Sequence, residues 1–144
     1  MNKLNLKIVY QHVWIDHPLH IKWFVDKQVL HDDISGNASV NFEKNLSLND
    51  GFHTLGFEIS KKTNKNTKLD NQHKIIKDTI IEIKDIRFDD ISVMQLVMYT
   101  KDFFQFVGQN SNHKIERANM FGYNGTMTIQ FQIPIYQWLV EKLF

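Results

Sequence analysis

Histidines and aspartates form the groups in this chain whose residue types suggest chemistry. Two groups stand out, the first made of His12, His17 and His20 and the second of His31, Asp32 and Asp33. Imidazole and carboxylate side chains bind zinc or iron when they converge on one point. The spacing does not favour such a site, because His17 and His20 flank Pro18 at the start of an extended segment and should point apart. We therefore expect surface and edge-strand histidines, with no metal and no cofactor.

Paired carboxylates are the second pattern with chemical meaning. Asp32–Asp33 and Asp89–Asp90 are adjacent pairs, and glycoside hydrolases need two carboxylates on opposite sides of a sugar ring. Adjacent aspartates in a turn point in different directions and are usually solvated turn formers. The chain also lacks a glycine-rich phosphate loop, a Gly-x-Ser-x-Gly elbow, a His-Glu-x-x-His pair and any cysteine. These observations predict that the protein is not an enzyme and has no disulfide.

Aromatic side chains offer a possible binding surface. Seven of them suggest a flat platform for a sugar or a partner protein: Trp14, Trp23, Tyr99, Phe103, Phe104, Tyr123 and Trp138. The candidate binding residues are Trp23, Phe103, Phe104, Tyr123 and Trp138, and core filling is the alternative for each. Phe103 and Phe104 are consecutive, so one of them faces away from the core if the segment is extended.

The elements that would position these residues are mostly strands. Apolar and polar residues alternate over 4–10, 19–25, 38–42, 55–59, 80–88 and 127–133, which is the period of a half-buried strand. The phase shifts between Ile83 and Ile86, which predicts a β-bulge near Lys84. Residues 61–74 lack this periodicity and are predicted to be a long polar loop. Pro134 opens a predicted amphipathic helix over about 135–143, with Ile135, Trp138, Leu139 and Leu143 on one side. This pattern predicts an all-β antiparallel β-sandwich with a short C-terminal helix.

Length and charge limit the number of domains and the kinds of partner that we expect. A chain of 144 residues with 42% hydrophobic residues fits a single β-sandwich domain, 1–144. No run approaches eighteen apolar residues and the first ten residues alternate, so we expect neither a membrane span, a membrane partner, nor a signal peptide. The formal net charge of +1 makes nucleic acid an unexpected partner. The lysine-rich segment 61–74 is expected to be a solvated loop, with phosphates or anionic glycans as the alternative.

Three segments carry a resemblance to a known family. The run 21–29, a strand, a turn and a returning strand, is similar to the opening of jelly-roll carbohydrate-binding modules, and 48–57 resembles their Leu-x-x-Gly-x-His-x-Leu strand. The run 80–91 looks like the strand that follows, so the resemblance covers roughly 19–93. It implies a jelly-roll sandwich, without the calcium site of the xylan-binding members, because Lys61 and Lys62 stand where their metal ligands would be. The ending 134–139 also resembles small proteins of marine T-even-like tailed phages.

These observations leave three hypotheses. The first is a non-enzymatic binding or structural protein that acts through contacts with other protein subunits or by self-association, in a virion or the host cytoplasm as the phage resemblance implies. The second is a glycan-binding module that stacks sugars on exposed aromatic rings. The third is an enzyme, for which His31 with Asp32 or Asp33 is the only local candidate.

Overall fold

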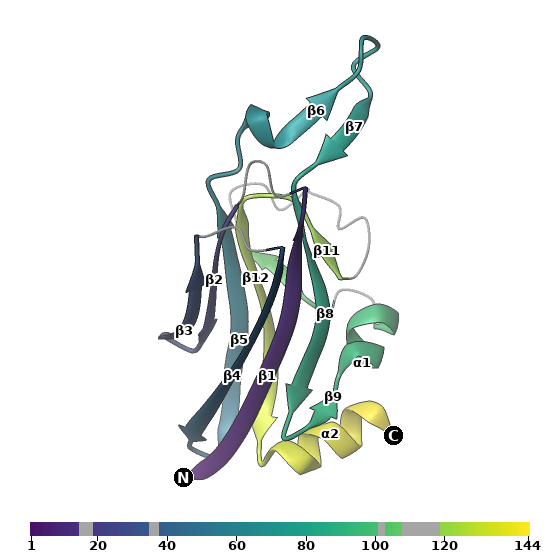
Figure 1. The fold of residues 1–144 in the computed structure, drawn as a ribbon. Coiled ribbons are helices and arrows are strands. Elements are labelled where there is room, and N and C mark those ends of the chain that lie inside the picture. The colour runs from purple at the N-terminus through teal and green to yellow at the C-terminus, as the bar shows by residue number, and fades with distance from the viewer. Residues whose placement is uncertain (15–18, 35–37, 101–102, 108–118) are drawn as a thin grey trace.

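The computed structural model describes residues 1–14, 19–34, 38–100, 103–107 and 119–144. Two antiparallel sheets pack against each other, and a separate hairpin projects from one end (Figure 1). The first sheet contains, in spatial order, β11 (Met120–Phe121), β8 (Ile80–Phe88), β1 (Asn2–Val13) and β4 (Ser39–Leu48), with β9 (Ile91–Ser92) paired to β8. The second contains β10 (Gln105–Val107), β12 (Gly125–Ile133), β5 (Gly51–Ser60), β2 (His20–Val25) and β3 (Gln28–Asp33). The predicted all-β antiparallel sandwich is confirmed.

The core lies between the two sheets and is built from the predicted alternating residues. In β1 every second residue from Leu4 to Tyr10 is buried, and the residues between them are half-buried. The same alternation places Ile21, Trp23 and Val25 of β2 inside. Neighbouring side chains of a strand point to opposite faces, so a period of two buries one complete face of each sheet.

The predicted β-bulge is present in β8. Val9 of β1 pairs with Asp85 and the next residue, Tyr10, pairs with Ile83, so Lys84 is the extra residue. The bulge lets Ile83 and Ile86, three positions apart, both reach the core.

The expected loop 61–74 is instead largely folded, which corrects the prediction. It contains a 3-10 turn, η1 (Asn64–Asn66), and β6 (Thr67–Leu69), which pairs with β7 (Ile75–Asp78). Polar side chains hold this segment. Thr63 and Asn66 form a reciprocal capping box, and the Asp70 carboxylate accepts from the backbone amides of Gln72 and Lys74. Such local polar bonds leave no hydrophobic periodicity in the sequence.

Two helices cover the end opposite the hairpin (Figure 1). The second, α2 (Ile135–Leu143), has the predicted bounds, and it buries Ile135, Trp138 and Leu139. The first, α1 (Met94–Tyr99), packs beside α2. Neither helix of the described chain has the length and apolarity needed to cross a membrane.

Candidate functional sites

A buried polar cluster joins the two sheets at one position. The hydroxyl of Tyr10 donates to Asp33 Oδ2 at 2.9 Å, and His12 Nε2 lies 2.9 Å from the same oxygen. Tyr10 and His12 belong to β1 in the first sheet, whereas Asp33 ends β3 in the second. All three side chains are at most 5% exposed. The carboxylate therefore acts as a shared acceptor that ties one sheet to the other.

Aromatic rings surround this cluster. The ring of Tyr10 lies 5.8 Å from that of Trp23, and His31 stacks on Phe42 with ring centroids 4.7 Å apart and an interplanar angle of 8°. Burial, followed by the nearby Asp33 carboxylate, raises the pKa of Tyr10 well above its ordinary value. The phenol therefore stays protonated and continues to donate to Asp33. The cluster is closed to solvent, so this geometry supports a structural role between the sheets.

His53 is the centre of a second polar site, nearer the surface. Its Nδ1 lies 2.7 Å from Asp26 Oδ2 and its Nε2 lies 2.7 Å from the carbonyl oxygen of Asn49. A carbonyl and an ionised carboxylate both accept, so both ring nitrogens donate when the ring is a charged imidazolium. Burial lowers the pKa of His53, but the hydrogen bonds to Asp26 and Asn49 outweigh it and leave the pKa raised.

The described histidines do not converge on a metal. His12 pairs with Asp33, His20 with Asp32 and His53 with Asp26, at separate places in the fold. Within the described residues no group of three or more histidine and carboxylate side chains has the geometry to hold a metal ion. His17, one of the candidate ligands, lies outside the described residues.

The paired aspartates separate in space, but only Asp89–Asp90 forms the expected turn; Asp32–Asp33 lies in β3, which corrects the prediction for that pair. Asp89 Oδ1 accepts from the backbone amide of Asn5 at 2.7 Å, and Asp90 Oδ1 binds Lys7 Nζ at 2.7 Å. Asp32 is half-exposed beside His20, whereas Asp33 is buried. His31, which the enzyme hypothesis places beside these carboxylates, stacks on Phe42.

Most of the predicted aromatic binding residues lie inside the protein. Trp23, Phe104 and Trp138 are 0%, 3% and 5% exposed and fill the core, which is the alternative that the sequence left open. Phe103 is half-buried and packs edge-on against Phe104, with ring centroids 5.3 Å apart. Tyr123 remains at the surface, 39% exposed, and Lys62 Nζ lies 5.9 Å from its ring centroid.

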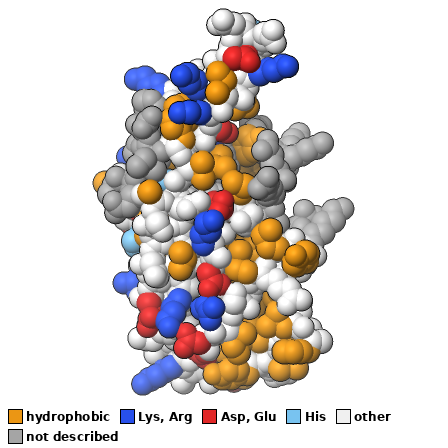
Figure 2. Space-filling view, turned by 45° about the vertical axis from the view of Figure 1, so that its right-hand side comes forward, with side chains coloured by type: hydrophobic (Ala, Val, Ile, Leu, Met, Phe, Trp, Pro, Cys, Tyr) orange, Lys and Arg blue, Asp and Glu red, His pale blue; other side chains and the backbone are white. Residues whose placement is uncertain are grey.

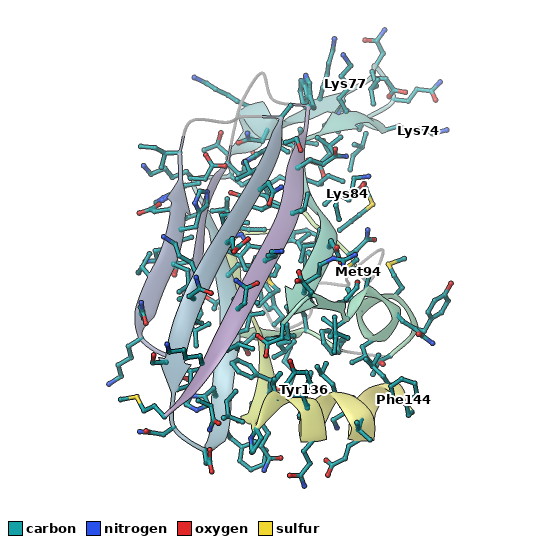
Figure 3. All side chains as sticks on the ribbon, turned by 60° about the horizontal axis from the view of Figure 1, so that its bottom comes forward. Lys74, Lys77, Lys84, Met94, Tyr136 and Phe144 are labelled. Carbon is teal, nitrogen blue, oxygen red and sulfur yellow. The ribbon has the colours of Figure 1, made fainter. Side chains whose placement is uncertain are left out.

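A group of exposed apolar side chains lies over the two helices. The outer side of α2 presents Tyr136, Val140 and Phe144, which are 59%, 58% and 95% exposed. Met98 and Tyr99 of α1 are 44% and 85% exposed. We call this surface the helical face and define it by Met94, Met98, Tyr99, Tyr136, Val140 and Phe144. Figure 2 shows hydrophobic side chains gathered at this end, and Figure 3 labels Met94, Tyr136 and Phe144 on it.

The sequence contains signals for both the buried polar cluster and the helical face. His12 follows Tyr10 by two positions in a strand, so both face the core and a buried imidazole requires a partner. Tyr136, Val140 and Phe144 are spaced by four, which places them on one side of a helix away from Trp138. The partner of His12, in contrast, is 21 residues away and no local pattern points to it.

A scan against protein-family models, a search of curated proteins and a search of solved structures each found no match.

Proposed function

We propose that the protein is a non-enzymatic β-sandwich that acts through protein–protein contacts, with the helical face as its contact surface. The observation that carries the proposal is the exposed apolar stripe Tyr136, Val140 and Phe144 on a helix whose other side is firmly packed. Contiguous exposed apolar surface on a soluble domain marks an interaction site. Aromatic residues and methionine are also enriched where protein interfaces form.

The packing beneath the helical face makes it a preformed surface. Trp138, on the inner side of α2, meets Phe88 of β8 edge-on, with ring centroids 5.8 Å apart. This contact fixes the rotation of the helix and therefore the direction of its outer stripe. A partner that binds here needs little reorganisation of the backbone, which lowers the entropic cost of association.

A second copy of the chain is the partner that we propose. The stripe is uncharged, and the whole chain carries a net charge of only +1, so two copies repel each other weakly. Two helical faces related by a two-fold axis would cover the same residues on both copies. The resemblance of 134–139 to phage proteins supports a virion or phage accessory protein as the setting of such a subunit contact.

The glycan alternative has less support. A sugar-binding platform needs exposed ring faces, and Trp23, Phe104 and Trp138 are buried. Tyr123 alone among the five candidates keeps more than a third of its surface exposed.

The proposal is tested by the mass of the protein in solution as a function of concentration. Sedimentation equilibrium and light scattering between about 5 and 500 µM should show a dimer that dissociates on dilution, since a dissociation constant in the micromolar range corresponds to about −8 kcal/mol. Tyr136→Glu and Val140→Glu should each shift the protein to monomer, because a buried carboxylate without a partner opposes association.

Val29→Glu is the matched control. Val29 is 51% exposed on the edge strand β3, on the side of the sandwich away from the helices (Figure 1). This variant should dimerise like the original protein. A wild-type chain that stays monomeric at every concentration, or an equal effect of the Val29 control, would contradict the proposal.

A further inference from the structure

The charge of the chain is divided unequally between the projecting hairpin and the rest. Residues 61–78 contain six lysines and two aspartates, a formal charge of +4. The remaining residues hold eleven basic and fourteen acidic side chains, a formal charge of −3. The net charge of +1 therefore conceals a strongly basic element, and the sequence expectation against nucleic acid rests on that total alone.

Most of these lysines have no carboxylate partner within the described part of the chain. Lys62 is bound at the base, where its Nζ lies 2.7 Å from Asp78 Oδ1 and 2.5 Å from the carbonyl oxygen of Gly122. Asp70 accepts from two backbone amides of its own turn. Five lysines form no ion pair with any described residue: Lys61, Lys65, Lys68, Lys74 and Lys77.

Like charges face each other within the hairpin. Lys68 of β6 and Lys77 of β7 are direct cross-strand partners. Like charges in this position repel and destabilise a strand pair, and an external anion relieves the repulsion. Figure 3 labels Lys74 and Lys77 on the hairpin, and Lys77 Nζ lies 5.9 Å from the ring centroid of Trp14.

The shape of the hairpin narrows the class of anionic partner that it fits. β6 and β7 form a two-stranded sheet of their own that stands out from the sandwich (Figure 1). The major groove of B-form DNA, about 12 Å wide and about 8.5 Å deep, admits a two-stranded ribbon. The major groove of duplex RNA is too deep and narrow for protein side chains to reach the base edges. The exposed turn residues Asn71, Gln72 and His73 carry groups that hydrogen-bond phosphates and base edges.

A lipid surface fits the same hairpin less well. Leu69 and Ile75 are exposed cross-strand partners next to the Lys68–Lys77 pair, with a register shift between the two pairs, and the polar turn 70–74 joins the two strands beyond them. An interfacial segment needs its apolar and basic groups to approach the membrane together. The polar turn 70–74 would enter the bilayer first.

We infer that the basic segment 61–78, which includes the hairpin β6–β7, binds the phosphate backbone of double-stranded DNA, without sequence specificity, through the five lysines that form no ion pair with a described residue. Each neutralised phosphate adds about −0.9 to the slope of log affinity against log salt concentration. Contacts from four lysines give a slope of about −3.6, so affinity falls about 150-fold between about 50 and 200 mM salt. The inference goes beyond the proposed protein contacts and does not depend on them.

The experiment is fluorescence anisotropy with a labelled DNA duplex of about 20 base pairs, titrated with the full chain at about 50 and 200 mM salt. Lys68→Gln/Lys77→Gln should weaken binding about tenfold or more at low salt and reduce the slope by about 2. The matched control is Lys3→Gln/Lys44→Gln, which removes two exposed lysines of β1 and β4 and changes the net charge equally. It should bind within about twofold of the original protein.

Three results would overturn the inference. They are no binding of the duplex at low salt, an equal loss in both variant pairs, and tighter hairpin-dependent binding to vesicles of phosphatidylcholine with about a quarter phosphatidylglycerol. Circular dichroism melting of each variant verifies that it is folded. The substitutions lie outside the helical face, so failure here and failure of the dimer proposal are distinguishable.

Discussion

His53 gives stability a dependence on pH that follows from its two acceptors. Because the pKa of His53 is raised, its contribution to the free energy of unfolding is complete below the ordinary pKa of 6.5. This contribution is lost as pH rises through the raised pKa. Burial raises the pKa of Asp26, but the hydrogen bonds from His53 and Thr54 outweigh burial and leave the pKa lowered. The ionised Asp26 therefore stabilises the fold above its ordinary pKa of 3.8, and this stabilisation is lost as pH falls through the lowered pKa. We expect these two groups together to stabilise the fold most between the ordinary pKa of Asp26, 3.8, and that of His53, 6.5. His53→Gln should remove about 0.5 kcal/mol of the alkaline decrease, because Asp26 is 46% exposed and screened.

Urea unfolding at about pH 5.5 and about pH 8.5 measures this effect. His73→Asn is the control, because His73 is an exposed residue of the hairpin turn. The control should keep the pH dependence of the original protein. If His53→Gln keeps it as well, the imidazolium assignment is wrong.

Tyr10→Phe tests the buried cluster. The change removes a donor to Asp33 without altering the ring, so the ring contact with Trp23 remains. A hydrogen bond to a charged group contributes about 1.5–3 kcal/mol, and we expect a loss of that size in chemical denaturation. Tyr99→Phe, at an 85% exposed position, should change stability by less than about 0.5 kcal/mol. An equally small effect at Tyr10 would show that the cluster does not hold the sheets together.

At this residue scale the sequence predicted the right residue types but not their partners. It singled out His12, His31 and Asp33, and the alternation already placed Tyr10 inside. The contact between His12 and Asp33 spans 21 residues and two sheets, so only the packing of the sandwich brings them together. Burial of Trp23 and Trp138 likewise depends on what covers each ring.

At the element scale, the pairing of β2 with β5 depends on a glycine. Gly56 lies directly opposite Phe24, and a Cβ on Gly56 would come within 2.4 Å of Cζ in that ring. Gly56→Ala should therefore cost about 1–3 kcal/mol through displacement of the phenylalanine. The double variant Gly56→Ala/Phe24→Ala should recover part of this loss in a double-mutant cycle of unfolding free energies. Strictly additive losses would contradict the close contact.

Elements with a hydrophobic period were predicted well, and elements without one were not. The bulge at Lys84 and the helix α2 follow from the phase of apolar residues along the chain. The turn η1, the strand β6 and the turn after it were predicted as a loop because their order comes from a capping box, a turn carboxylate and the Thr67–Asp78 bond. Those interactions use polar residues that are equally common in loops.

For the whole molecule, the structure predicts two levels of local stability. The sandwich buries its strands on one face, whereas β6 and β7 form a two-stranded sheet of their own and keep Leu69, Ile75 and Ile76 exposed. A two-stranded hairpin alone is marginally stable in water. Hydrogen exchange with mass spectrometry should therefore show faster exchange in β6 and β7 than in β1 and β5. Equal protection in both regions would mean that the hairpin unfolds only with the body.

The sequence by itself determined the class of this protein, because a period of two along the chain decides which side chains turn toward a core wherever the strands come to lie. Only the tertiary structure decided which carboxylate each histidine meets, which aromatic rings are covered, and that the lysine-rich segment projects from the sandwich as a hairpin. The physical reason is the separation along the sequence over which each property is set. Periodicity involves neighbouring residues, whereas contact partners and exposure depend on segments far apart in sequence that pack together.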